Sequence, residues 1–200
     1  MHKDDISSMT ITNMTKDDIL KLKAATLYVL TQCGETDYVH LFKILYFAER
    51  HHYANYGKHL VPDVFCALER GPVPSFLYDA LKLASGFHTV PKDNSLWKIA
   101  DAITPGGGEC YYMIQAKEKP DMDELSRAEI ESLNLSIKEN LPKTSKQLSI
   151  DSHDDAWKTA WETRHASMID PILIAKAGGA SEGFMEYLKE QEDLNNLLAD

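Results

Sequence analysis

The sequence predicts an α+β fold that is mostly helical and carries a small antiparallel β-sheet. Most of the chain places apolar residues at helical spacing, behind Ser, Thr or Asp residues that suit a helix N-terminus. Two short apolar runs flank a glycine-rich loop at 104–109, which is typical of a β-hairpin over about 96–116. A third apolar run at about 64–69 is bounded by prolines and glycine and predicts a short strand.

The first two helices are the clearest elements. Thr15 and Asp18 form a capping box for a helix over about 16–33 that ends at Gly34. A second helix is expected over 38–56, ending at Gly57. Its apolar residues cover most of its circumference, so we expect it at the centre of the core. Such an apolar second helix argues against a helix-turn-helix, whose recognition helix is polar and basic.

The middle of the chain reads as short elements joined by turns. Gly71-Pro72-Val73-Pro74 is a turn by composition, and a helix is expected from Pro74 or Ser75 to about Gly86. The two arms of the expected hairpin are 96–103 and 110–116.

The C-terminal half reads as a series of capped helices. The expected helix starts lie behind Ser126, Thr144, Ser152 and Ser181. The last helix, at about 181–198, is acidic. We expect one domain over 15–200, behind a polar N-terminal tail at 1–14.

Charge and composition narrow the function. The 200 residues hold 21 Lys and Arg against 31 Asp and Glu, a net charge of −10, which argues against direct nucleic-acid binding. The acidity lies in residues 93–200, so 118–200 is the candidate surface for a basic partner, with a solvated helix surface as the alternative. No stretch approaches the roughly 20 apolar residues of a membrane span, and three scattered cysteines suit a reducing cytoplasm.

Catalytic and metal motifs are not evident. The glycine-rich loop runs between two expected strands and not into a helix, which favours a hairpin turn over a phosphate cradle. His51, His52, His59 and Asp151 to Asp155 supply ligand types without the spacing of a zinc site. Cys66 lies in an apolar run, and Cys33 is at a helix C-terminus, which raises a thiol pKa. We therefore expect no catalytic residue, cofactor or metal.

Several fragments nevertheless follow one another in a specific order. They are KILYFAE at 43–49, YGKHL at 56–60, Gly71-Pro72-Val73 with Leu77-Tyr78, and SHDDAWK at 152–158. In this order they resemble the Panacea domain, the SocA-like antitoxin family that is often labelled phage-associated. The resemblance covers roughly residues 20–165.

The resemblance implies a mostly helical fold with a small sheet and a role without catalysis. Panacea proteins are described as antitoxins of type II toxin–antitoxin pairs, which neutralise toxins encoded beside them by direct protein contact. For this chain the implied partner is a cognate toxin, expected to be basic.

The residues that carry the resemblance are Lys43, Tyr46, Glu49, Gly71, Pro72, Val73, His153 and Trp157. Each has a functional and a structural interpretation. Tyr46 and Trp157 suit core anchors or interface hot spots, and Lys43 and Glu49 suit an internal pair or a solvent-facing position. Because Lys43 shares a side of its helix with Arg50, we expect both charges to reach the edge of the apolar surface.

Two other functions stay open at this point. One is an uncharacterised hydrolase or metal-dependent enzyme that uses His153 and Asp154. The other is a phage-encoded adaptor that acts on a host protein.

Overall fold

The central element of the fold is a long apolar helix. The computed structural model describes residues 14–107 and 112–199, so the expected tail lies outside the described residues except for Met14. Helix α2 (Tyr38–Tyr56) packs against the helix before it, α1 (Lys16–Cys33), and against elements from the rest of the chain. Both helices have the predicted bounds, because their caps are local: Thr15 and Asp18 form the capping box of α1, and Gly57 ends α2 in a left-handed conformation.

Within residues 14–107 and 112–199, two small antiparallel sheets are present where one was expected. Strand β2 (Phe65–Leu68) pairs with β3 (Gly71–Pro74), a segment that composition had indicated to be only a turn. Pro72 lies opposite Ala67. The N–H of Ala67 donates its hydrogen bond to the carbonyl oxygen of Ser167, on the other side of β2. The missing N–H of proline therefore removes no hydrogen bond between these two strands.

The second sheet is three-stranded and has the order β1-β5-β4. Strands β4 (Ile103–Pro105) and β5 (Met113–Ala116) form the predicted hairpin, and the two-residue β1 (Thr36–Asp37) pairs with β5. Part of the expected loop and of its second arm, residues 108–111, lies outside the described residues. The first arm is shorter than predicted because its start forms helix α4 (Trp97–Ala100) after a turn stabilised by the Asn94 side chain.

Helix α3 (Ser75–Ala84) begins where it was predicted, directly after β3. Its N-cap, Pro74, supplies no side-chain hydrogen bond. The cap comes instead from Asp63, in the loop between α2 and β2. Its carboxylate accepts hydrogen bonds from the backbone N–H groups of Phe76 and Leu77 at the start of α3. Burial raises the pKa of Asp63 to about 6, against the effect of these hydrogen bonds.

The C-terminal part is helical, as predicted. After the short 3-10 helix η3 (Met122–Glu124), it contains α5 (Arg127–Asn140), α6 (Ser145–Asp151), α7 (Asp155–Thr163), α8 (Pro171–Ala177) and α9 (Glu182–Ala199). The capping boxes at Ser126 and Thr144 are both present. The cap of α7 differs from the prediction: Ser152 ends α6, and Asp154 accepts the hydrogen bond from the Trp157 N–H.

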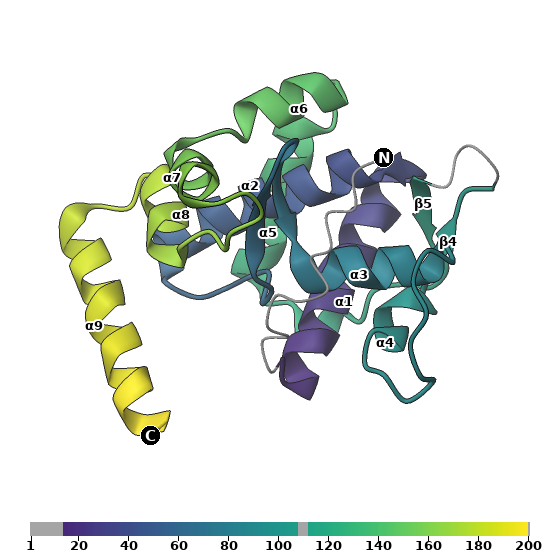
Figure 1. Ribbon diagram of the computed structural model, residues 1–200, viewed down its shortest axis with the longest axis horizontal. Coiled ribbons are helices and arrows are strands. Elements are labelled where there is room, and N and C mark those ends of the chain that lie inside the picture. Colours follow the sequence, from purple (N-terminus) through teal and green to yellow (C-terminus); the bar gives the residue numbers. More distant parts are fainter. Residues whose placement is uncertain (1–13, 108–111, 200) are drawn as a thin grey trace.

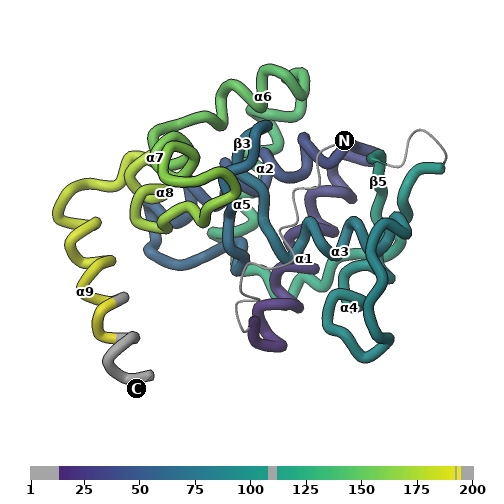
Figure 2. The backbone as a smooth tube through the Cα atoms, viewed as in Figure 1, coloured from purple at the N-terminus to yellow at the C-terminus, as the bar shows by residue number. Residues whose placement is uncertain are grey.

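The core is gathered around α2, which is packed against α1, α5, α6, α8 and β3 (Figure 1). Helix α9 extends away from this body, as the tube view also shows (Figure 2). A small second cluster of Tyr53, Ile172, Ala175 and Leu188 attaches the first half of α9 to α2 and α8. In the part of the chain that the structure describes, no helix is long and apolar enough to cross a membrane.

Candidate functional site

The residues singled out in the sequence come together mainly around one buried side chain, that of Lys43 on α2. The residue is 1% exposed, and its Nζ atom donates a hydrogen bond of 2.7 Å to the carbonyl oxygen of Pro72 on β3. The expectation that its charge reaches the edge of the apolar surface is wrong, because β3 covers the end of the side chain. We call Lys43, Tyr46, Gly71, Pro72, Ser152, His153, Asp154 and Trp157 the motif cluster.

The ammonium group of Lys43 has little compensation for its burial. Among the described residues no carboxylate lies within 4 Å of it, and the Pro72 carbonyl uses one of its three donors. Burial lowers the pKa of Lys43 to about 7, since the interior solvates a charge poorly. A lysine in this position changes its protonation state near neutral pH.

Gly71 lets the two strands of the β2–β3 hairpin approach Lys43 closely. Its φ angle is +98°, and an added Cβ would lie 2.4 Å from Ser152 Oγ and 2.9 Å from Lys43 Cε. Only glycine fits this conformation and this space without strain. The Gly-Pro pair of the motif thus provides both the close approach and the carbonyl that receives the lysine.

Tyr46 lies about one helical turn after Lys43 on α2, and it connects α2 to α7. Its buried hydroxyl lies 3.0 Å and 2.9 Å from the two carboxylate oxygens of Asp154, and Arg50 Nη1 lies 3.0 Å from Asp154 Oδ2. Burial, and then the negative charge of Asp154, raise the pKa of Tyr46 far above its usual value. Since Asp154 also caps α7, one carboxylate orders the helix start and fixes it to the core.

Trp157 fixes α7 to the first hairpin. Its Nε1 atom donates a 2.9 Å hydrogen bond to the carbonyl of Leu68, and the His153 ring stacks on the indole at 3.7 Å between centroids. Burial, and then the positive charge of Lys43, lower the pKa of His153. Within the described chain, His153 Nε2 is buried and has no hydrogen-bond partner.

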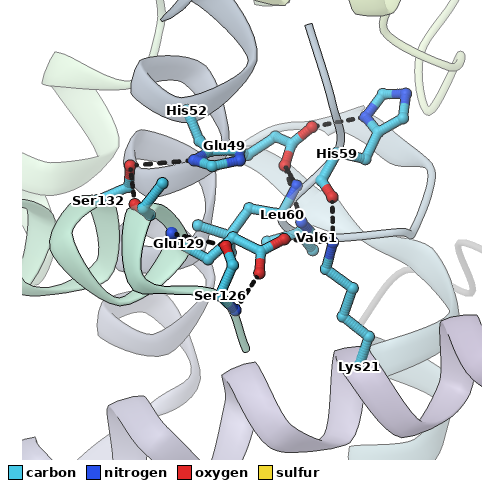
Figure 3. A network of polar contacts seen from close by, with 10 residues as sticks. Lys21, Glu49, His52, His59, Leu60, Val61, Ser126, Glu129 and Ser132 are labelled. Atoms are coloured by element: carbon cyan, nitrogen blue, oxygen red, sulfur yellow. Dashed lines mark hydrogen bonds and ion pairs between the residues drawn. The ribbon is translucent and has the colours of Figure 1, made fainter. Parts of the chain in front are cut away.

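Glu49 lies apart from the motif cluster, within the polar network of Figure 3. It is 1% exposed, and Oε2 accepts hydrogen bonds from the N–H groups of Leu60 and Val61. Oε1 lies 2.6 Å from His59 Nδ1. Glu49 therefore holds the loop between α2 and β2 against the side of α2, and does not pair with Lys43.

A cleft of about 610 Å³ opens beside the motif cluster, and we call it the Lys43 cleft. Five aromatic residues, three cationic residues and two acidic residues line it, together with Val39, Leu68, Val73 and Ser145. They are Tyr38, Phe42, Tyr78, Phe87 and Tyr112; Lys43, Arg70 and Lys82; Asp37 and Glu69. Val73, the remaining motif residue, therefore faces this cleft.

Residues 41–158 match the protein-family model described as "Antitoxin SocA-like, Panacea domain". The chain belongs to this family. The match confirms the resemblance and contains all eight residues that carried it. Neither the curated proteins nor the solved structures gave a match.

The matched region runs from α2 to α7, and the motif cluster joins its two ends. Sequence reasoning missed the contribution of Arg50 and Ser152. The small size of Ser152, directly before His153, was the one feature in the sequence that could have indicated close packing there. Its closeness to Gly71 depends on the tertiary fold. Asp154 was named as a possible metal or catalytic group, or as an acid in the first turn of a capped helix; in the structure it is the N-cap of that helix.

Three side chains of types used in catalysis, Asp154, Cys33 and Cys66, have structural surroundings in this protein. The Asp154 carboxylate faces Tyr46, Arg50 and the Trp157 N–H. Burial raises the pKa of both Cys33 and Cys66 to about 11. In the part of the chain that the structure describes, no three His, Cys, Asp or Glu side chains are grouped to hold a metal ion.

Proposed function

We propose that this chain is the antitoxin of a type II toxin–antitoxin pair and neutralises a toxin protein, encoded nearby, by direct contact. The observation that carries the proposal is the match of residues 41–158 to the SocA-like antitoxin family. The arrangement of the motif cluster supports a binding role, because its polar groups hold α2, β3 and α7 together.

The surface most suited to the toxin is α9, which lies outside the family region. Phe184 and Leu188 pack this helix beside Gly57 at the end of α2. Tyr187 and Leu194 are half-exposed and seven residues apart, about two turns, so they lie on one side of the helix. Exposed apolar side chains among acidic ones suit a basic partner with an apolar groove.

Co-expression with the neighbouring reading frame tests the antitoxin function. We expect that the neighbour alone arrests growth, that this chain restores it, and that the two proteins co-purify. A harmless neighbour, or a toxic one that this chain neither rescues nor binds, would overturn the proposal.

Matched charge reversals then test the surface. Glu186→Lys with Glu190→Lys changes two exposed acids on α9, whereas Asp93→Lys with Asp101→Lys makes the same change in charge around α4, on the far side of the molecule (Figure 1). We expect the α9 pair to slow association with the toxin at least tenfold and to weaken its salt dependence. The control pair should stay within twofold. Equal effects of both pairs would exclude α9 as the specific surface without affecting the growth result.

A further inference from the structure

The Lys43 cleft contains a cation that is buried without a counter-ion. Lys43 is 1% exposed and lines the cleft, and two of its three donors have no acceptor among the described residues. The acids in the lining are engaged or exposed. Asp37 caps α2 and lies 2.6 Å from His40 Nδ1, and Glu69 is exposed at the β2–β3 turn. An anionic group from outside the chain would complete the site.

The walls of the cleft indicate what such an anion is attached to. Phe42 and Tyr78 meet edge to face at 5.9 Å, and Tyr78 also lies beneath Lys82 Nζ at 4.6 Å. Phe87 is 63% exposed and Tyr112 46% exposed at the same cleft. Aromatic walls around a few polar groups, in a volume of about 610 Å³, are typical of sites for small organic molecules.

We propose that the Lys43 cleft binds a small molecule that carries a carboxylate or phosphate on a planar, apolar body. The anion accepts hydrogen bonds from Lys43 at the base, and the body lies against the aromatic side chains of the cleft, Tyr78, Phe87 and Tyr112. This inference does not depend on the proposed antitoxin function.

The burial of Lys43 makes this binding proton-linked. An anion beside the ammonium favours its charged form, so binding at a pH above the free value of about 7 draws a proton from solvent. The other titratable groups that face this space are, in the cleft, Asp37, Glu69, Arg70, Lys82 and the tyrosines Tyr38, Tyr78 and Tyr112, and, behind Lys43, His153. Burial and the positive charge of Lys43 lower the pKa of His153, and this residue lies outside the lining of the cleft.

NMR titration of the full chain with benzoate, phenyl phosphate, inorganic phosphate and benzamide tests the proposal. We expect benzoate and phenyl phosphate to shift the resonances of Val39, Leu68 and Val73. Benzamide, the uncharged match of benzoate, and inorganic phosphate, which lacks the apolar body, should each bind at least tenfold more weakly. Benzamide binding as tightly as benzoate, or shifts confined to other regions, would overturn the proposal.

Lys43→Met tests the contact itself, because methionine keeps most of the apolar volume and removes the charge. We expect it to weaken benzoate binding at least tenfold, because the charged hydrogen-bond donor that receives the anion is removed. Lys98→Met, an exposed position on α4, should bind as the wild type does.

A second measurement needs only the wild-type chain. Calorimetry of benzoate binding at pH 7.5 in two buffers of different ionisation enthalpy should show uptake of a fraction of a proton. No proton uptake, or equal affinity of a folded Lys43→Met protein, would contradict the role of Lys43.

Discussion

The Gly71→Ala substitution tests the central contact of the motif cluster. Gly71 has a φ angle of +98°, and a Cβ would lie 2.4 Å from Ser152 Oγ, 2.9 Å from Lys43 Cε and 3.0 Å from Lys43 Nζ. Two effects therefore add: an L-residue is strained at this φ angle, and the methyl group overlaps atoms that are themselves held by the core.

The expected magnitude follows from these two effects. Backbone strain contributes about 1–3 kcal/mol, and overpacking a dense region contributes about 1–3 kcal/mol. The reduced entropy of the unfolded chain offsets about 0.4–1 kcal/mol. We expect a net loss of about 2–5 kcal/mol in the free energy of unfolding. A loss of about 3 kcal/mol corresponds to a decrease in Tm of about 6–12 °C for a chain of this size.

Urea and thermal unfolding followed by circular dichroism measure this loss, and two further variants separate its causes. Gly34 has a φ angle of +73° and nothing within 4 Å of an added Cβ, so Gly34→Ala reports strain alone. Ser152→Gly removes the nearest atom, so in that background Gly71→Ala should be less destabilising by about 1 kcal/mol or more.

Two results would refute the reasoning. One is a Gly71→Ala protein no less stable than the Gly34→Ala protein, since the overlap would then contribute nothing. The other is additivity of Gly71→Ala and Ser152→Gly, which would mean that the two side chains do not meet.

Three more predictions concern polar groups that bond to buried partners. Tyr46→Phe removes a hydrogen bond to a carboxylate and should lower the free energy of unfolding in urea by about 1.5–3 kcal/mol, whereas the half-exposed Tyr56→Phe should change little. Because the pKa of Lys43 is lowered from 10.5 to about 7, the unfolded chain binds more protons above pH 7. Stability should then rise by on the order of 1 kcal/mol per pH unit between pH 7.5 and 8.5, and Lys43→Met should remove that slope; equal slopes would contradict the burial of the charge. Burial opposes protonation of His59, but the hydrogen bond and charge of Glu49 outweigh it and raise the pKa. The resulting stabilisation is complete below pH 6.5 and is lost as the pH rises through the folded value. An NMR titration should therefore show a His59 pKa above 6.5 that decreases in Glu49→Gln, and an unchanged value would argue against the pair.

Local signals explain what the sequence predicted well. The caps of α1, α5 and α6 involve residues three apart, so the sequence alone contains the whole interaction. The order of the motifs was sufficient to indicate the family, and the central position of α2 followed from its apolar circumference.

Non-local pairing explains what the sequence did not predict. Strand β3 exists because it pairs with β2, and the carboxylate that accepts the hydrogen bond of the Tyr46 hydroxyl lies 108 residues further along the chain. Neither the residue type of Lys43 nor the pattern of its helix predicts that its ammonium group is buried. The carbonyl that accepts its hydrogen bond belongs to Pro72, 29 residues away in the sequence. The Lys43 cleft is lined by residues from four separate stretches of the chain, and their proximity cannot be predicted from composition or local pattern.

The long sequence separations within the motif cluster bear on how this protein folds during synthesis. Tyr46 and Asp154 are 108 residues apart, and Trp157 and Leu68 are 89 apart. A nascent chain that ends before α7 already contains α2 with the Tyr46 hydroxyl. It does not yet contain the Asp154 carboxylate that accepts the hydrogen bond of this hydroxyl. We therefore expect the native core to form late, after α7 has left the ribosome, and at the slow rates typical of long-range contacts. Until then, the apolar circumference of α2 is only partly covered, which makes the unfinished chain a natural substrate for chaperones and proteases.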